Sequence, residues 1–192
     1  MNLETERLFM RPVTARDGDA LYRLHTDPLV VELIMQRKLP TRAESDARLD
    51  LYLDEWDRYG YGFWMLYLRE PSGDLTFVGR AGLRRYDEND VEVGVCLFGF
   101  SSGKGIAGES LDAAIEFGFR RLPLRRLVCV VRPTNIRSQK AMLRLGFSFV
   151  GMTEHLETVF RFYEMQRPRN SRCPHFSDIT ASPRRREADE LR

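Results

Sequence analysis

The sequence predicts one α/β (α+β) domain built from short strands and amphipathic helices. Its 192 residues suit a single domain better than two, since domains cluster near ~100–150 residues. With 43% hydrophobic and 11% aromatic residues, the chain has enough apolar side chains for a sizeable core. Three consecutive β-rich runs occupy its middle, and segments with helical spacing of apolar residues lie on either side of them.

The N-terminal part of the chain predicts one strand and two helices. Residues 3–11 alternate apolar and charged side chains, which is typical of a strand. Thr14 precedes an aspartate by three residues, the spacing of a helix cap, and helical periodicity continues over residues 14–26 until Pro28 ends it. Residues 41–58 interleave apolar side chains with acids and arginines, which predicts a second helix.

The rest of the chain changes its period twice. Residues 63–68, 77–83 and 91–98 are β-rich runs separated by turn-prone segments, so three consecutive antiparallel strands are the economical interpretation. A helix, a buried strand, a second helix and a closing pair of strands follow at residues 103–121, 127–131, 135–145, 147–152 and 158–165. Apolar content and periodicity then fall away, which predicts a domain over residues 1–167 and a flexible C-terminal tail over residues 168–192.

Composition argues against several classes of protein. The 30 basic residues nearly balance the 28 acidic ones, so the net charge of +2 offers no global electrostatic case for nucleic acid or a membrane surface. The triplet Arg184–Arg186 in the predicted tail could make a weak RNA contact, although a solvated charge run is the favoured interpretation. Three cysteines without CxxC spacing favour a reducing cytoplasm over a disulfide framework. No apolar run approaches the ~20 residues needed to span a bilayer.

Arginine dominates the basic residues. Only Lys38, Lys104 and Lys140 are lysines, so 27 of the 30 basic residues are arginine. Arginine forks suit phosphates and carboxylates, but a GC-rich coding sequence produces the same bias without any functional meaning. The bias alone therefore predicts no site.

The most informative segment, residues 91–110, is a strand that runs into a glycine-rich turn and then a helix. Such a turn gathers free backbone N–H groups and the positive end of the helix dipole into an anion site for phosphate, and Lys104 adds a cation. A Walker A loop does not fit, because only three residues separate Gly99 from the Gly–Lys pair and Gly105 replaces the hydroxyl residue. A dinucleotide GxGxxG matches the letters from Gly103 onward, but no parallel βαβ unit frames it. The third interpretation is a pyrophosphate loop for coenzyme A.

A second block makes that third interpretation specific. Residues 127–147 read as a strand, an asparagine turn, a helix and a Gly146–Phe147 exit. Together the two blocks resemble the GNAT acyltransferase superfamily and, within it, the RimJ/RimL-like group that acetylates N-terminal amines of ribosomal proteins and related small amines. Residues 3–8 and the pair Asp27–Pro28 are similar to that group's N-terminal signature, and the resemblance covers residues 2–166.

The resemblance implies a GNAT fold: a central, mostly antiparallel mixed sheet of about seven strands, with strands four and five splayed apart and about four flanking helices. Acetyl-CoA would be the co-substrate, without a metal, with its pantetheine arm between the splayed strands and its pyrophosphate in the glycine turn. The implied cofactor-binding residues are Val95, Cys96, Leu97, Phe98, Ser101, Ser102, Gly103, Lys104, Gly105, Ile106, Ala107, Gly108, Asn135 and Ser138. Asn135 would hydrogen-bond the pantetheine arm, with a helix cap as the structural alternative, and Ser138 would protonate the departing thiolate.

The implied reaction is direct transfer of an acetyl group to a primary amine within a ternary complex. The amine must first lose a proton, from an ordinary pKa of ~8 for an α-amine or ~10.4 for lysine. Glu92 is the first candidate for the base, against the alternative of a surface glutamate without a catalytic role. The N–H groups from Val95 to Leu97 are candidates for binding the oxyanion. The acceptor, a protein N-terminus or a small amine, is expected to contact residues 27–38 and 154–157, where no motif is legible.

Departures from the family pattern leave a second function open. Met142 replaces the tyrosine that commonly serves as the acid, so Ser138 or solvent must take that role. Val95 and Ser102 also stand where the family usually has aromatic residues. The alternative function is an acyl-CoA-binding regulatory protein of the same fold that lacks turnover, and both a monomer and a homodimer are left open.

Overall fold

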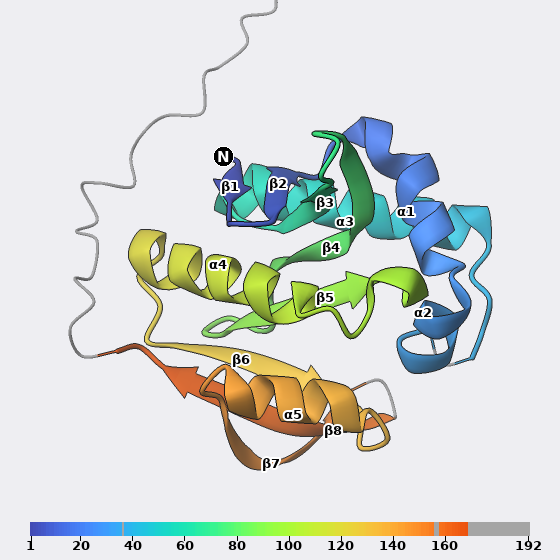
Figure 1. Cartoon of the computed structure of the whole chain (residues 1–192). Helices are drawn as coiled ribbons and strands as arrows, with labels where there is room; N and C mark the ends of the chain where they lie inside the picture. The colour runs from blue at the N-terminus through green and yellow to red at the C-terminus, as the bar shows by residue number, and fades with distance from the viewer. Residues whose placement is uncertain (36, 156–157, 169–192) are drawn as a thin grey trace, which may run out of the picture.

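A computed structural model describes residues 1–35, 37–155 and 158–168 of the chain (Figure 1). Within these residues, eight strands form one open sheet in the order β1-β2-β3-β4-β5-β6-β8-β7, and five α-helices pack on it. Neighbouring strands are antiparallel except β5 and β6, which run parallel. The mixed α/β class and the mostly antiparallel sheet are confirmed, with one strand and one helix more than expected. The predicted tail lies outside the described residues, except for Pro168.

The elements have the following bounds. The strands are β1 (Leu3–Glu4), β2 (Leu8–Pro12), β3 (Phe63–Arg69), β4 (Leu75–Arg85), β5 (Val91–Leu97), β6 (Arg126–Val131), β7 (Ser148–His155) and β8 (Thr158–Gln166). The α-helices are α1 (Gly18–His25), α2 (Pro28–Leu33), α3 (Arg42–Tyr59), α4 (Ile106–Arg121) and α5 (Ile136–Arg144). Short 3₁₀ turns, η1 (Ala15–Asp17) and η2 (Gly99–Ser101), precede α1 and follow β5.

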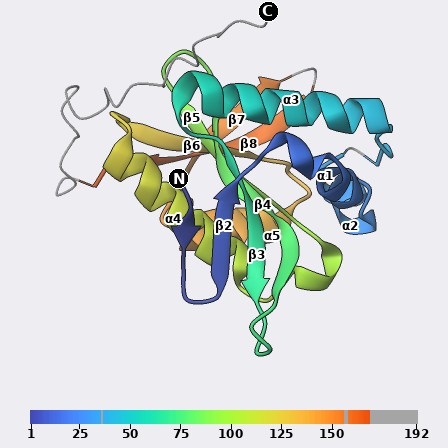
Figure 2. The same ribbon diagram turned by 90° about the horizontal axis from the view of Figure 1, so that it is seen from above.

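The helices cover the two faces of the sheet in two groups. Helices α1, α2 and α3 lie on one face, and α4 and α5 lie on the other (Figures 1 and 2). Each face has its own apolar core, one centred on Trp64 and Leu111 below α4, the other on Leu24 and Met65 below α1 and α3. Side chains alternate along each strand, so each residue of β5 faces one helix group or the other.

Strands β5 and β6 pair over only a short stretch. Their parallel register contains two residue pairs, Val91 with Leu127 and Glu92 with Val128, although both strands continue beyond them. The two strands therefore separate toward their C-terminal ends, as expected for the fourth and fifth strands of the predicted sheet. This gap lies directly before the glycine turn that leads into α4.

Three element boundaries differ from the expectations. The expected strand over residues 3–11 is two strands, because Thr5 and Leu8 bond to each other in a tight turn and reverse the chain. Pro28 does not only end a helix but begins α2, since the Asp27 carboxylate caps the N–H groups of the new helix and proline is favoured at its first position. Helix α4 begins at Ile106 because Gly105 adopts a left-handed conformation.

Candidate functional site

The glycine turn presents bare backbone at the N-terminus of α4. Gly103 and Gly105 have φ angles of 84° and 82°, in the left-handed region that favours glycine. A Cβ at Gly103 would lie 3.3 Å from Nη2 of Arg137, and a Cβ at Gly105 would lie 3.2 Å from Nη2 of Arg7. Because Gly105 has no side chain to cap the helix, the N–H groups of the first turn of α4 keep no side-chain acceptor. This cradle fits an anion such as a phosphate.

Two arginines that the sequence did not single out border this cradle. Arg7 comes from the β1–β2 turn, and its Nη1 donates to the carbonyl of Lys104 at 2.9 Å. Arg137 comes from the first turn of α5, and its guanidinium makes no hydrogen bond or ion pair with any described residue. Arg137 and the exposed Lys104 add positive charge beside the predicted pyrophosphate loop, whereas the charge of Arg7 is paired with Glu109. Neither arginine was predictable, because each reaches the loop from a distant part of the chain.

Hydrogen bonds to Glu109 hold the β1–β2 turn against α4. The Glu109 carboxylate accepts hydrogen bonds from the Thr5 hydroxyl, from the Arg7 backbone N–H at 2.9 Å and from Arg7 Nε at 2.7 Å. Burial alone would raise the pKa of Glu109, but the bonds from Thr5 and Arg7 outweigh it and hold this pKa below its ordinary value. The part of the N-terminal signature that contains Thr5 and Arg7 therefore positions the glycine turn.

Some residues of the predicted cofactor-binding set stabilise the glycine turn through contacts within the protein. The Ser101 hydroxyl is buried and lies within hydrogen-bond distance of the carbonyls of Val78 (3.0 Å) and Phe98 (2.9 Å). Ile106 is buried in the apolar core, so its side chain does not face the cradle. The Asp27 carboxylate, besides capping α2, accepts a bond from the Gly99 N–H at 3.2 Å. These contacts hold the loop in place while leaving its outer backbone exposed.

The gap between β5 and β6 carries backbone donors. Phe98 N–H donates to the carbonyl of Val78 in β4, and the β4–β5 register has no shift, so alternate residues repeat this direction. The N–H groups of Cys96 and Phe98 therefore point to β4, whereas those of Val95 and Leu97 point toward β6. Beyond Glu92, β6 no longer pairs with β5, so Val95 and Leu97 present their N–H groups to the gap.

The second predicted block places Asn135 and Ser138 where β6 passes into α5. Asn135 is the N-cap of α5, and its side-chain oxygen accepts a bond from the Ser138 N–H at 3.1 Å. This is the structural role anticipated for Asn135, and it leaves the amide Nδ2 without a bonded partner among the described residues. The Ser138 hydroxyl is half-buried on the first turn of α5. Met142 is buried in the core and cannot supply a proton.

Glu92 lies on the face of the sheet covered by α1 and α3. Val91 and Val93 belong to the opposite core, and Cys96 belongs to the core on the α3 side, so alternation turns Glu92 toward α3. Glu92 is 5% exposed, and its Oε2 accepts from Arg84 at 2.7 Å from Nε and 2.6 Å from Nη2. Burial works to lower the pKa of Arg84, but the charge and hydrogen bond of Glu92 raise it. Glu92 is therefore a buried, paired glutamate rather than a half-exposed surface side chain.

The two cysteines of the described residues are buried thiols, and no metal-binding cluster occurs in the same part of the chain. Burial raises the pKa of the Cys96 thiol to about 11 and that of the Cys129 thiol well above its ordinary value. Both side chains are thus protonated at neutral pH, in agreement with small buried residues. No group of three or more His, Cys, Asp or Glu side chains that could hold a metal ion occurs in the described part of the chain.

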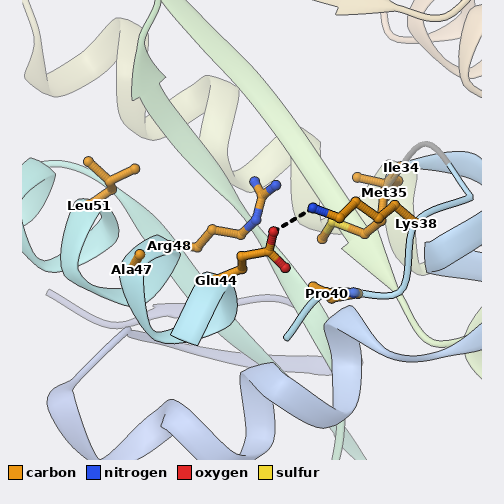
Figure 3. Close-up of a pocket in the computed structure, with 8 residues that line it drawn as sticks. All are labelled: Ile34, Met35, Lys38, Pro40, Glu44, Ala47, Arg48 and Leu51. Atoms are coloured by element: carbon orange, nitrogen blue, oxygen red, sulfur yellow. Dashed lines mark hydrogen bonds and ion pairs between the residues drawn. The ribbon is translucent and has the colours of Figure 1, made fainter. Parts of the chain in front are cut away.

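An open pocket of about 460 Å³ lies between the segment after α2 and the first half of α3 (Figure 3). It is lined by Ile34, Met35, Lys38, Pro40, Glu44, Ala47, Arg48 and Leu51. Part of this lining falls in residues 27–38, where the acceptor was expected. Of the other expected acceptor segment, residues 156–157 lie outside the described residues.

An open sheet with splayed β5 and β6, a glycine cradle at the N-terminus of α4 and a capped α5 defines an acyl-CoA-dependent transferase architecture. A family model described as "Acetyltransferase (GNAT) domain" matches residues 7–148, and the chain belongs to this GNAT acetyltransferase family. Structures of RimL and of ribosomal-protein acetyltransferases are among those that share its fold. The chain is thus an acetyltransferase that uses acetyl-CoA.

Individual relatives agree with this assignment. The uncharacterized N-acetyltransferase YnaD of Bacillus subtilis is 26% identical over 149 residues, covering 76% of this chain and 82% of YnaD. An acetyltransferase structure from Agrobacterium tumefaciens is similar with a TM-score of 0.73 and 23% identity, covering 86% of this chain and 94% of that one. RimL, described as a ribosomal L7/L12 alpha-N-protein acetyltransferase in complex with coenzyme A, is similar with a TM-score of 0.71 and 18% identity, covering 86% and 98%.

The residues present fit acetyl-CoA. The Gly103–Gly105 cradle, which a Cβ would crowd, offers N–H donors and bordering arginines to a pyrophosphate. The N–H groups of Val95 and Leu97 offer strand-like donors to an extended amide chain. No helix in the described residues combines the length and apolarity needed to cross a membrane.

Proposed function

We propose that this chain transfers the acetyl group of acetyl-CoA directly to a primary amine, a protein N-terminus or a small molecule, within a ternary complex. The observation that carries the proposal is the placement of Glu92 on the α3 face beside the gap into which Val95 and Leu97 direct their N–H groups. Acetyl-CoA supplies an activated thioester. The chain supplies the groups that bind it, orient the amine and move the protons.

Each residue has a role that follows from its position. Glu92 accepts the proton of the attacking ammonium, directly or through one water, and its ion pair with Arg84 holds the carboxylate in a single orientation. The N–H groups of Val95 and Leu97 stabilise negative charge that develops on the carbonyl oxygen. Ser138, on the first turn of α5, or solvent returns a proton to the thiolate, because Met142 cannot.

The wider cofactor site is part of the same proposal. The backbone of Gly103 to Gly108 binds the pyrophosphate with Lys104 beside it, and Asn135 offers its free amide Nδ2 to the pantetheine arm. Cys96 and Phe98 contribute through their place in β5 rather than through their N–H groups, which point to β4.

Release of free thiol from acetyl-CoA tests this function. Peptides with an N-terminal serine or alanine and a set of small primary amines serve as acceptors, and at least one of them should support saturable turnover. Calorimetric titration with coenzyme A runs in parallel. Binding of coenzyme A without thiol release on any amine would favour the second candidate, an acyl-CoA-binding regulator, for which the buried Met142 is the supporting observation.

The variant Glu92→Gln tests the proposed base. It should lower kcat by roughly 10²–10⁴-fold and flatten the dependence of kcat on pH, because the amide cannot accept the proton. Glu116→Gln is the matched control, since Glu116 is an exposed glutamate on α4 paired with Arg120. An unchanged pH profile in Glu92→Gln would remove Glu92 from the mechanism.

A further inference from the structure

Arg80 in β4 is a buried cation without an anionic partner. It is 8% exposed, and its guanidinium carbon lies 4.1 Å from the centroid of the Phe63 ring and 4.8 Å from that of the Tyr52 ring. Its guanidinium makes no hydrogen bond or ion pair with any described residue, and the buried Nε is without a partner. Ring stacking stabilises a guanidinium but supplies no acceptor for its N–H groups, so a buried arginine of this kind calls for an explanation.

A second buried polar atom without a partner lies in the same cluster. This atom is Nε2 of His25. In the described residues, His25 Nε2 and Arg80 Nε are the two buried side-chain nitrogen or oxygen atoms without a hydrogen-bond partner. The His25 ring lies 6.5 Å from that of Tyr52, and its Nδ1 is 2.8 Å from the Ser45 hydroxyl. Burial, and then the charges of Arg80 and Arg48, lower the pKa of His25 to about 3, so this histidine is neutral and adds no charge.

Arg48 brings a second uncompensated cation to this place. It lies on α3 three residues after Ser45 and four before Tyr52, on the same helix face, and it extends into the pocket toward the segment that follows α2 (Figure 3). It forms no ion pair with the described residues. Glu44 is the carboxylate among the lining side chains, and it already accepts from Lys38 Nζ at 2.7 Å and from the Thr41 N–H at 2.8 Å.

Arg80 lies beside the middle of β5, and Arg48 is near enough for its charge to act on the Cys96 thiol there. Arg80 pairs in register with Cys96, which lies between the two residues whose N–H groups face the gap. Burial raises the pKa of the Cys96 thiol, Asp27 raises it further, and Arg80 and Arg48 oppose this. The nearby carboxylates have partners of their own: Asp27 accepts from the N–H groups of Leu29 and Gly99, and Glu92 is paired with Arg84. The acceptor side of the gap therefore has an excess of positive charge.

We infer that the acceptor of this enzyme is a primary amine that also carries a carboxylate, which Arg80 and Arg48 bind while the amine reaches the thioester. This inference rests on the proposed acetyl transfer. Two cations near the reacting amine lower its pKa and favour the neutral form that attacks, and they repel polycationic amines. An ammonium group alone would bind weakly beside Arg80 and Arg48, and a carboxylate on the same molecule raises the affinity of the acceptor for this site. Ile34, Met35 and Leu51 accommodate the apolar part of the acceptor.

Matched acceptors that differ by one charge test the inference. The peptides Ser-Asp-Ala-Phe-amide and Ser-Asn-Ala-Phe-amide present or lack a side-chain carboxylate, and serine and serinamide present or lack a free α-carboxylate. All rates are expressed per unprotonated amine. The wild type should prefer the carboxylate member of one pair by about tenfold or more in kcat/KM, as expected for a charge-assisted contact. The pair that shows the preference identifies the source as a peptide or a free amino acid.

Variants assign the preference to the arginines. Arg48→Gln, at an exposed position, should remove most of the preference by lowering kcat/KM for the carboxylate member far more than for the neutral member, and Arg80→Gln should do the same where it folds. Arg58→Gln is the control, because Arg58 lies exposed at the end of α3 and pairs with Asp54. Equal rates for both members of each pair, or a preference that survives in Arg48→Gln, would overturn the inference.

A binding measurement separates this inference from the proposed function. The N-acetylated forms of the same peptides and amino acids are titrated into the protein with coenzyme A, by calorimetry. Tighter binding of the carboxylate form without turnover of any amine would support the anion site and refute the acetyl transfer. Turnover of neutral amines with no carboxylate preference would support the transfer and refute the anion site.

Discussion

Substitution of Gly105 by alanine tests whether the glycine turn binds the cofactor. Gly105 has a φ of 82°, and a left-handed conformation costs an ordinary L-residue about 1–2 kcal/mol. For a domain of this size, about 1 kcal/mol corresponds to ~2–4 °C in Tm, so the strain alone predicts a fall of ~2–8 °C. The added Cβ would also lie 3.2 Å from Arg7 Nη2, the end of a side chain anchored to Glu109 and Lys104.

The cofactor effect is expected on top of this loss of stability. A methyl group in the cradle holds a phosphate away from the N–H groups, and loss of one charge-assisted contact of this kind is worth about tenfold or more in affinity. Gly105→Ala should therefore raise the KM for acetyl-CoA and the Kd for coenzyme A by about tenfold or more. Steady-state kinetics and calorimetric titration measure the two quantities separately.

Gly73→Ala is the matched control for backbone strain. Gly73 lies in the β3–β4 turn with a φ of 88°, and an added Cβ there meets nothing within 4 Å. It should lower the Tm by a similar amount and leave the affinity for coenzyme A unchanged. Equal affinities in Gly105→Ala and Gly73→Ala would refute the assignment of the turn as the pyrophosphate site.

Two further predictions concern the start of α4. Glu109→Gln should lower the free energy of unfolding near neutral pH. Because the folded-state pKa of Glu109 lies below its ordinary 4.5, the stabilisation by its carboxylate is present above pH 4.5 and disappears as the pH falls through the folded-state pKa. Urea unfolding of the wild type and the variant at several pH values should therefore give free energies that converge in acid. Gly108→Ala, in the first turn of α4 with open space around the new Cβ, should stabilise the fold by about 0.5–1 kcal/mol in thermal unfolding, and a lower Tm would show that this space is not free.

Local pattern was enough to predict most of the elements. The β-rich runs and the helical periodicity depend on side chains close together in sequence, and they gave the central strands and the helices α3, α4 and α5 within a few residues. The predicted and observed element boundaries differ where a single residue ends one element and begins or shapes another. Pro28 ends one helix and begins the next, and Thr5 forms a turn within what alternation presents as one strand.

The backbone part of the candidate site was predictable for the same reason. Gly103 and Gly105 shape the turn through their own φ angles, so their spacing in the sequence carries the information. The positions of the side chains around the turn depend instead on contacts between segments that are distant in sequence. Arg7 approaches the turn from the β1–β2 turn and Arg137 from α5, and a single sequence holds no local signal that these two side chains meet there.

The arginine excess illustrates this difference. A bias shared by 27 basic residues predicts no site, because it includes ordinary surface arginines such as Arg42 and Arg58, which pair with carboxylates on their own helix. The informative arginines are those that lack a carboxylate partner and also lie at the glycine cradle, in the pocket or in the core. Arg137 beside the glycine cradle, Arg48 in the pocket and Arg80 beside the middle of β5 lack such a partner in the described residues. On the proposed function, a phosphate beside Arg137 and a carboxylate beside Arg48 and Arg80 would complete the hydrogen bonds of these guanidinium groups.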